Sequence, residues 1–278
     1  MRKALLFKVL PALALLPLWA GAAGKCEMLV ATGNPENPPY LWKDPQSPQH
    51  LIGANADLLM LIGEQLGLKV EMLHTGSWAQ AEEEVRSGRV DLLAGVTLDL
   101  PRLEVVDYVH PAFLVMPTVV WVGKDNGFPY GGWEDLRGRK GGVAENARLA
   151  PQFASFARDN LTLEKEAGRL QAFQKLLLGR TDYLLYERHS GQALVEPKGM
   201  LDSLEALEPP VSSEGLYLGL SHNSACNDPW LRGQLAKKMT ELTAAGVPES
   251  LLQRNLQRWK AQQPQSLDLP SQEQEKSE

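Results

Sequence analysis

A short stretch in the first half of the chain carries residues that could bind a carboxylate. Gly95, Thr97 and Arg102 follow a short apolar run within a few positions. An arginine guanidinium is a planar, permanently charged donor that can bind a carboxylate through two parallel hydrogen bonds. A threonine hydroxyl can complete such a cradle, and a glycine lets a ligand approach the main chain. A plainer interpretation stays open, in which Arg102 is a surface residue paired with Glu104 or Asp107 and the other two serve a turn.

Aromatic residues offer candidate walls for the same ligand. Tyr40 and Trp42 lie on a proline-rich loop after the first apolar run, where they could form one face or a lid. Trp78 follows a later apolar run through the turn Gly76-Ser77. Aromatic side chains more often serve plain packing than ligand contact, so both interpretations stay open.

The sequence lacks the patterns of common catalytic and metal sites. We find no nucleophile elbow, no phosphate-binding loop and no metal-ligand spacing, and we therefore predict no catalytic residue, no metal and no cofactor. The histidines are scattered rather than clustered: His50, His74, His110, His189 and His222.

The first residues have the order of a secretory signal peptide. Arg2, Lys3 and Lys8 flank an apolar run that is shorter than the roughly 20 residues needed to span a bilayer. Small residues follow, so we expect a signal peptide over residues 1–23, with cleavage after Ala22 or Ala23. Lys25 stands where a lipoprotein has a small residue before its first cysteine. These features predict a periplasmic protein without a lipid anchor.

Charge and cysteine content agree with export. Loss of the signal peptide takes the net charge from -6 to -9, and an acidic chain without basic clusters is a poor binder of nucleic acid. Cys26 and Cys226 are the two cysteines. In a chain that leaves the reducing cytoplasm, a disulfide between them is expected.

Short apolar strands alternate with amphipathic helices, which is typical of an α/β fold. Asn55 is the expected cap of the first helix and Gly67 its stop. After residue 262 the composition is polar, which predicts a disordered tail over 263–278. The expected strands are 28–31, 70–73, 90–94, 118–122, 142–144, 161–163, 183–186 and 216–220, and the expected helices are 53–66, 78–87, 149–158, 169–178, 229–244 and 248–260.

Short sequence motifs occur along the chain, and the most specific series runs from Thr97 through Arg102 to Phe113. The motifs are Pro38-Pro39-Tyr40, residues 53–66, residues 88–95, Thr97, Arg102, Val106-Asp107-Tyr108, Pro111-Ala112-Phe113, residues 135–139, residues 178–183 and Gly246-Val247. Together they resemble the family 3 bacterial extracellular solute-binding proteins, the amino-acid receptors of ABC importers, over roughly Cys26 to Trp259.

The resemblance implies a two-lobed type II periplasmic-binding-protein fold whose first lobe is discontinuous. The first lobe would comprise residues 24–116 and 214–262, and the second lobe residues 117–213. Two strand crossovers would form the hinge, near 117–122 and 209–215. Ligands would bind between the lobes, where loops at strand ends converge.

The resemblance also implies roles for individual residues. Arg102 would bind a ligand carboxylate, supported by Thr97 and Gly95, and Trp78 would form an aromatic wall. Glu187 falls where the family has an aspartate that pairs the ligand's ammonium. The family's glycine-threonine motif appears here as Asn146-Ala147, which lacks the hydroxyl. The predicted ligand-binding residues are Arg102, Thr97, Gly95, Trp78, Glu187, Tyr40 and Asn146.

These features predict a monomeric, non-enzymatic protein that captures a small carboxylate-bearing ligand, favouring a polar amino acid, for an inner-membrane ABC permease. Two alternatives stay open. The fold also resembles cyclohexadienyl dehydratases, in which Glu187 would act as a general acid on prephenate or arogenate. A closed, loaded lobe pair could instead report to a membrane signalling partner.

Overall fold

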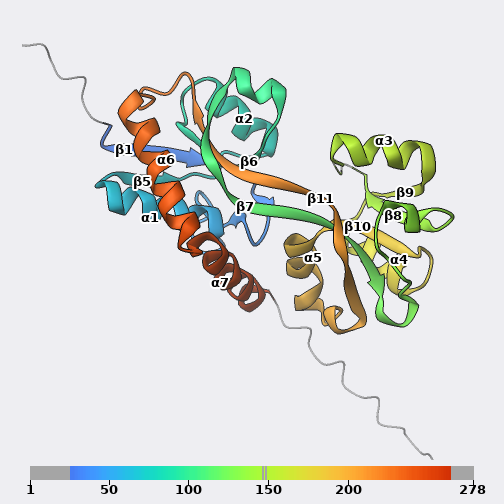
Figure 1. The fold of residues 1–278 in the computed structure, drawn as a ribbon. Coiled ribbons are helices and arrows are strands. Elements are labelled where there is room, and N and C mark those ends of the chain that lie inside the picture. Colours follow the sequence, from blue (N-terminus) through green and yellow to red (C-terminus); the bar gives the residue numbers. More distant parts are fainter. Residues whose placement is uncertain (1–25, 146, 148, 264–278) are drawn as a thin grey trace, which may run out of the picture.

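The computed structural model describes residues 26–145, 147 and 149–263. The predicted signal peptide, Asn146 and the predicted tail after Gln263 lie outside the described residues. Two groups of elements are joined by two long strands (Figure 1).

The first lobe contains the N-terminal elements and the last two helices. Its strands and helices alternate, as the apolar pattern predicts. They are β1 (Met28–Thr32), β2 (Glu36–Asn37), β3 (Leu41–Lys43), β4 (Leu51–Ile52), α1 (Ala54–Leu66), β5 (Lys69–Met72), α2 (Trp78–Arg86), β6 (Leu92–Thr97), α6 (Pro229–Ala244) and α7 (Val247–Gln262), with a 3₁₀ helix, η1, over Leu100–Glu104.

The second lobe contains the middle of the chain. Its elements are β8 (Lys140–Ala144), α3 (Pro151–Asn160), β9 (Thr162–Glu166), α4 (Arg169–Leu177), β10 (Tyr183–Glu187) and α5 (Arg188–Val195). Helix α5 was absent from the sequence-based expectation.

Two strands of 18 residues, β7 (Val106–Gly123) and β11 (Leu204–Ser221), run through both lobes and pair with each other in antiparallel register. The resulting sheet has the order β5-β1-β6-β11-β7-β10-β8-β9. The sequence predicted only the segments 118–122 and 216–220 of these strands. Their register shifts between Leu207 and Ser212, beside the cis peptide bond before Pro209.

Helix α1 begins one residue earlier than its predicted cap. Gly53 is the N-cap, with a φ of 138°, and a Cβ there would lie 2.4 Å from the Tyr40 carbonyl oxygen, so only glycine fits. The prediction that Asn55 caps the helix is wrong. Asn55 is buried, and its side-chain amide donates to the Ala94 carbonyl at 2.9 Å. Gly67 ends the helix in the left-handed conformation, as expected.

Separate hydrophobic clusters fill the two lobes. One cluster packs α1 residues such as Leu59 and Ile62 against Leu218 of β11 and Leu235 of α6, so segments far apart in sequence share the first core. The second lobe has clusters around Phe173 and around Phe153 and Tyr183. The domain boundaries at 116/117 and 213/214 stay a prediction.

Cys26 and Cys226 form a disulfide, which confirms that expectation. The bond joins the chain just before β1 to the segment before α6, across a sequence separation of 200 residues. It therefore fastens the returning part of the first lobe to its opening strand. Within the described residues, we find no helix of the length and apolarity needed to cross a bilayer.

Candidate ligand-binding site

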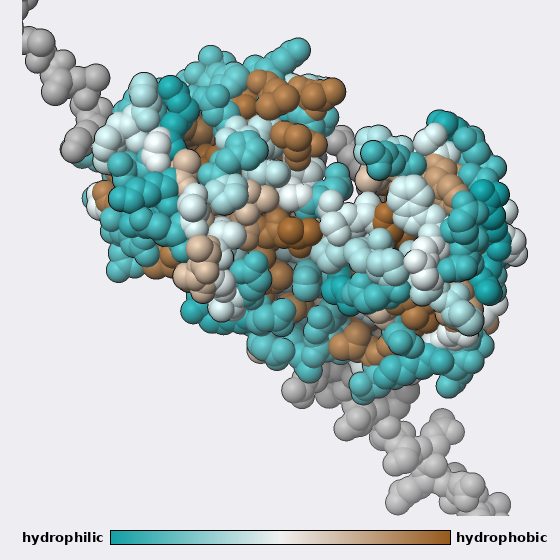
Figure 2. Space-filling view, in the orientation of Figure 1, coloured by the Kyte–Doolittle hydropathy of each residue, from teal (hydrophilic) through white to brown (hydrophobic). Residues whose placement is uncertain are grey.

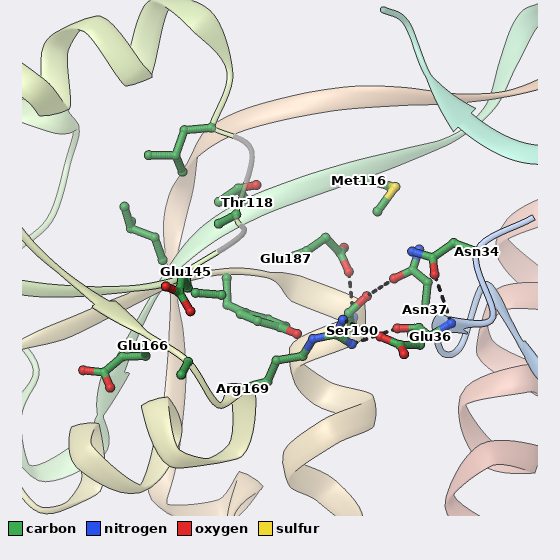
Figure 3. Close-up of a pocket in the computed structure, with 16 residues that line it drawn as sticks. Asn34, Glu36, Asn37, Met116, Thr118, Glu145, Glu166, Arg169, Glu187 and Ser190 are labelled. Carbon is green, nitrogen blue, oxygen red and sulfur yellow. Dashed lines mark hydrogen bonds and ion pairs between the residues drawn. The ribbon is translucent and has the colours of Figure 1, made fainter. Parts of the chain in front are cut away.

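A cavity of about 620 Å³ lies where residues of the two lobes meet. Asn34, Glu36 and Asn37 line it from the loop after β1 and from β2, and Thr118 lines it from β7. Figure 3 shows Asn34, Glu36 and Asn37 opposite Arg169, Glu187 and Ser190 of the second lobe, with Thr118, Glu145 and Glu166 farther along the second-lobe side. The space-filling view shows a notch between the lobes along its upper edge (Figure 2). Polar side chains from both lobes therefore converge on one hollow.

Glu187 combines a structural role with a place in this cavity. It is the N-cap of α5, where its carboxylate accepts hydrogen bonds from the backbone N–H groups of His189 at 3.1 Å and Ser190 at 2.6 Å. The hydroxyl of Tyr40, which belongs to the first lobe, donates to Glu187 Oε1 at 2.9 Å. A carboxylate offers about four lone-pair directions, so one on Oε2 is left for a further donor.

Burial and the Glu187 charge act on the neighbouring titratable groups. Tyr40 is fully buried, and this burial, reinforced by the nearby Glu187 carboxylate, raises the pKa of its phenol well above the usual value. Burial lowers the pKa of His189, whose ring lies edge-on to that of Tyr40. Tyr40 is therefore a neutral donor and His189 a neutral ring at physiological pH.

Two further polar contacts cross between the lobes at this cavity. Arg169, at the start of α4, donates to the Glu36 carbonyl at 2.8 Å and lies 3.3 Å from the Glu36 carboxylate (Figure 3). Ser190 Oγ donates to Asn37 Oδ1 at 3.0 Å. The loop that leads from β1 through β2 is thus tied to α4 and α5 of the second lobe.

The cavity wall is rich in carboxylates. Glu166 forms an ion pair with Lys175 at 2.7 Å, and Glu36 pairs with Arg169. Glu145 and Glu187 also line the cavity. A cationic group on a ligand would find carboxylate partners here.

Arg102 lies in η1, outside the residues that line the large cavity, and only 8% of it is exposed. Its Nη2 donates to Glu82 Oε1 at 2.8 Å and its Nη1 to the Thr97 carbonyl at 2.9 Å. Asp99 Oδ2 is 3.9 Å from Nη2. Burial acts to lower the Arg102 pKa, but the hydrogen bonds that Arg102 donates to Glu82 and Tyr108 outweigh it, so the pKa of the guanidinium is raised.

Arg102 lines a second, smaller cavity of about 270 Å³, which is also lined by Glu82, Arg86 and Asp99. The guanidinium carbon of Arg102 is 5.6 Å from the centre of the Trp78 ring, at the start of α2. Three predicted site residues, Arg102, Thr97 and Trp78, are therefore neighbours. The partner of Arg102 is Glu82, and not Glu104 or Asp107.

Thr97 and Gly95 belong to β6 rather than to a turn, which corrects their expected setting. The Thr97 carbonyl is occupied by Arg102 and by the Tyr108 hydroxyl. Gly95 has a φ of +101°, and a Cβ there would lie 2.0 Å from the Asn55 side-chain nitrogen. Glycine is required at this position by the packing of Asn55, whatever its role toward a ligand.

The two loop aromatics are buried instead of forming an open lid. The Trp42 ring packs edge-on against Trp259 at 5.4 Å, and its Nε1 donates to Gln262. Tyr40 reaches the site through its hydroxyl alone. Asn146, the remaining predicted ligand contact, lies outside the described residues.

Sequence reasoning missed Glu36, Asn37, Arg169 and Ser190 as cavity residues, and Glu82 as the partner of Arg102. One signal was present for Arg169, because it follows Gly168 at the predicted start of a helix. The start of α5 carried no comparable signal. Its cap, Glu187, is a residue type that is uncommon at helix N-caps.

Two α/β lobes, joined by two strands and with a cavity between them, define the two-lobed type II binding-protein fold. The chain belongs to the bacterial extracellular solute-binding proteins, family 3, because the model of that family matches residues 29–258. Both statements confirm the expectation drawn from the sequence. No curated protein sequence matches the chain.

Solved structures of the same fold resemble this chain at low sequence identity. A histidine kinase sensor domain is 22% identical, with a TM-score of 0.61, and the match covers 83% of this chain and 96% of that one. An amino acid ABC transporter substrate-binding protein from Streptococcus pneumoniae, bound to L-arginine, is 20% identical, with a TM-score of 0.60 and coverage of 84% and 96%.

A binding component of an ABC transporter from Wolinella succinogenes, complexed with lysine, is 20% identical, with a TM-score of 0.64 and coverage of 82% and 95%. At these identities the similarity establishes the shared fold.

Proposed function

We propose that this chain, after export to the periplasm, captures a polar amino acid between its lobes and delivers it to an inner-membrane ABC permease. The observation that carries the proposal is the cavity of about 620 Å³ to which both lobes contribute polar and charged side chains. Family membership supports it, as do structural neighbours that hold L-arginine and lysine. Export rests on the N-terminal sequence.

In this proposal, Glu187 binds the ligand's ammonium group. Its carboxylate faces the cavity, and one lone-pair direction on Oε2 is left after its three hydrogen bonds within the protein. Arg102, with Thr97 and Trp78 beside it and Gly95 on the same strand as Thr97, binds the ligand's carboxylate. Its Nη1 already donates to the Thr97 carbonyl and the Tyr108 hydroxyl, so the second N–H of Nη2, beside the one that Glu82 uses, supplies the donor. Arg102 lines the smaller cavity and Glu187 the larger one, so one ligand contacts both residues only when the lobes close further.

Binding and general acid catalysis make different demands on Glu187. Three donors point at this carboxyl group, which leaves one position on Oε2. That position can accept from a ligand ammonium or carry the proton of a general acid, so these contacts are compatible with both roles. The dehydratase alternative is the weaker candidate because the sequence offers no catalytic partner for Glu187.

A sensory role is the second candidate, and the similarity to a histidine kinase sensor domain supports it. Transport and sensing use the same ligand-binding lobes, so the site does not separate them. Permease and ATPase genes beside the gene for this chain would favour transport, whereas a sensor kinase gene would favour signalling.

A thermal-shift screen tests the claim that the transport and sensing proposals share, which is that the chain binds a polar amino acid. A ligand that binds only the folded state raises the melting temperature by mass action. We expect a polar amino acid to raise it in a concentration-dependent manner, and organic acids that lack an ammonium group to have a smaller effect. A panel of amino acids without effect would contradict the proposal.

A further inference from the structure

The Arg102 guanidinium, which would bind the ligand's carboxylate, already binds a carboxylate of the protein. Arg102 Nη2 and Nε donate to Glu82 Oε1 at 2.8 and 3.3 Å, which places Glu82 on one side edge of the guanidinium. Such an edge, with two adjacent N–H groups, is the geometry that a free carboxylate uses to bind arginine. Glu82 therefore occupies a position that a ligand could use.

The elements around the pair fix this arrangement. Trp78 and Glu82 lie one turn apart on α2, so their side chains share a face of the helix. Arg102 lies over the Trp78 ring and contacts Glu82 at the same time. The Thr97 carbonyl holds its Nη1 from the other side. The guanidinium is consequently held toward α2.

The pair borders open space on the Glu82 side, while Arg102 itself is buried. Glu82 and Arg102 both line the cavity of about 270 Å³, and the Glu82 side chain is 35% exposed. Asp99, 3.9 Å from Arg102 Nη2, adds a second carboxylate. An incoming carboxylate would thus meet one guanidinium whose charge is already balanced by acidic neighbours.

We propose that Glu82 is an internal competitor for the ligand's carboxylate, which limits the affinity of the site. The proposal rests on the assignment of Arg102 to the ligand under the proposed function. Whether the ligand displaces Glu82 or shares the guanidinium with it, two carboxylates near one cation repel each other. Loss of the Glu82 charge therefore strengthens the capture of a carboxylate ligand.

The test is a calorimetric titration of the full mature protein and its Glu82→Gln variant with the amino acid selected by the thermal-shift screen. The Gln variant should bind about tenfold more tightly or better, because a neutral amide competes less for the guanidinium. Glu83→Gln is the matched control. It makes the same charge change on the same helix, at an exposed residue 3.7 Å from Arg86, and should leave the affinity within about twofold.

A second ligand distinguishes competition for the guanidinium from a general effect of Glu82→Gln on binding. The carboxamide of the same amino acid has no carboxylate to compete with Glu82, so the Glu82→Gln gain should disappear for it. An equal gain for both ligands would overturn the proposal, as would unchanged or weaker binding of the amino acid by Glu82→Gln.

The outcomes also separate this proposal from the proposed function. Amino-acid binding by the wild type without a gain in Glu82→Gln would overturn the competitor role alone. Absence of binding in both proteins would overturn the proposed function, and the competitor role with it. Binding by Glu82→Gln where the wild type shows none would support both.

Discussion

The Tyr40 hydroxyl donates a 2.9 Å hydrogen bond to Glu187 Oε1, which joins residues 147 positions apart on different lobes. The phenol comes from the loop before β3, and the carboxylate caps α5. The same carboxylate lines the large cavity. The Glu187 side chain therefore takes part in a contact between the lobes and is also a candidate ligand contact.

Removal of the Tyr40 hydroxyl should lower the stability of the folded protein. A hydrogen bond to a charged group contributes about 1.5–3 kcal/mol, so Tyr40→Phe should lower the free energy of unfolding by that amount. Urea denaturation measures the change. Tyr217→Phe is the control, because the ring of Tyr217 packs edge-on against Tyr108 and this contact survives the loss of the hydroxyl. Equal effects of the two substitutions would argue against a specific contribution from the Tyr40 bond.

The buried tyrosines should make the folded state less stable at alkaline pH. Burial raises the pKa of Tyr130 to about 12, and it raises the pKa values of Tyr40, Tyr183 and Tyr186 above the usual value. The folded state thus retains phenol protons that the unfolded chain releases near pH 10, so stability is full below about pH 10 and falls as the pH rises further. Phenolate absorbance should show these four of the six tyrosines ionising later in native than in unfolded protein. Identical titration curves would contradict this prediction.

The disulfide should contribute strongly to stability. It closes a loop with a sequence separation of 200 residues, for which chain entropy gives a stabilisation of about 5 kcal/mol. Denaturant unfolding with and without a reducing agent measures the difference. Quantitative thiol labelling of denatured, unreduced periplasmic protein should detect no free thiol, whereas two free thiols per chain would contradict the bond.

Arg102→Ala should weaken ligand binding by about a hundredfold or more, because loss of one partner from a desolvated charge pair typically costs about 3–5 kcal/mol. Calorimetry measures the affinity, and circular dichroism checks that the variant is folded. Arg89→Ala is the matched control, since Arg89 pairs with Glu84 and is not among the residues that line either cavity. Wild-type affinity in a folded Arg102→Ala variant would show that Arg102 does not bind the ligand.

The alternation of strands and helices was predictable because each element buries an apolar face of regular period. The full length of β7 was not, since Pro111 and polar residues interrupt its apolar pattern before Pro117. Helix α5 was missed because it is short and contains Gly191, which weakens the helical signal. Local sequence preference therefore identified the layers but only short segments of the two strands that join the lobes.

Site contacts were harder to predict than elements. The partners expected for Arg102 were its sequence neighbours Glu104 and Asp107, yet the partner is Glu82, 20 residues away on α2. Asp107 instead lies 3.8 Å from Arg232 of α6. Which carboxylate reaches a given guanidinium depends on how α2 and η1 pack, and this packing leaves no local mark in the sequence.

The central claim is that the chain binds an amino acid through Glu187 and leaves it chemically unchanged. The most direct measurement is a calorimetric titration of wild-type and Glu187→Gln protein with the selected amino acid, followed by mass spectrometry of the recovered ligand. Incubations with prephenate and arogenate are analysed in the same way. Glu196→Gln is the control, because Glu196 pairs with Lys260 and is not among the residues that line the cavity.

The account predicts that the wild type binds one amino acid per chain and returns it intact, and that Glu196→Gln binds as the wild type does. Glu187→Gln should stay folded and bind at least about a hundredfold more weakly, because the ammonium loses its charged partner. Wild-type affinity in folded Glu187→Gln would contradict the account, as would turnover of prephenate or arogenate that disappears in that variant.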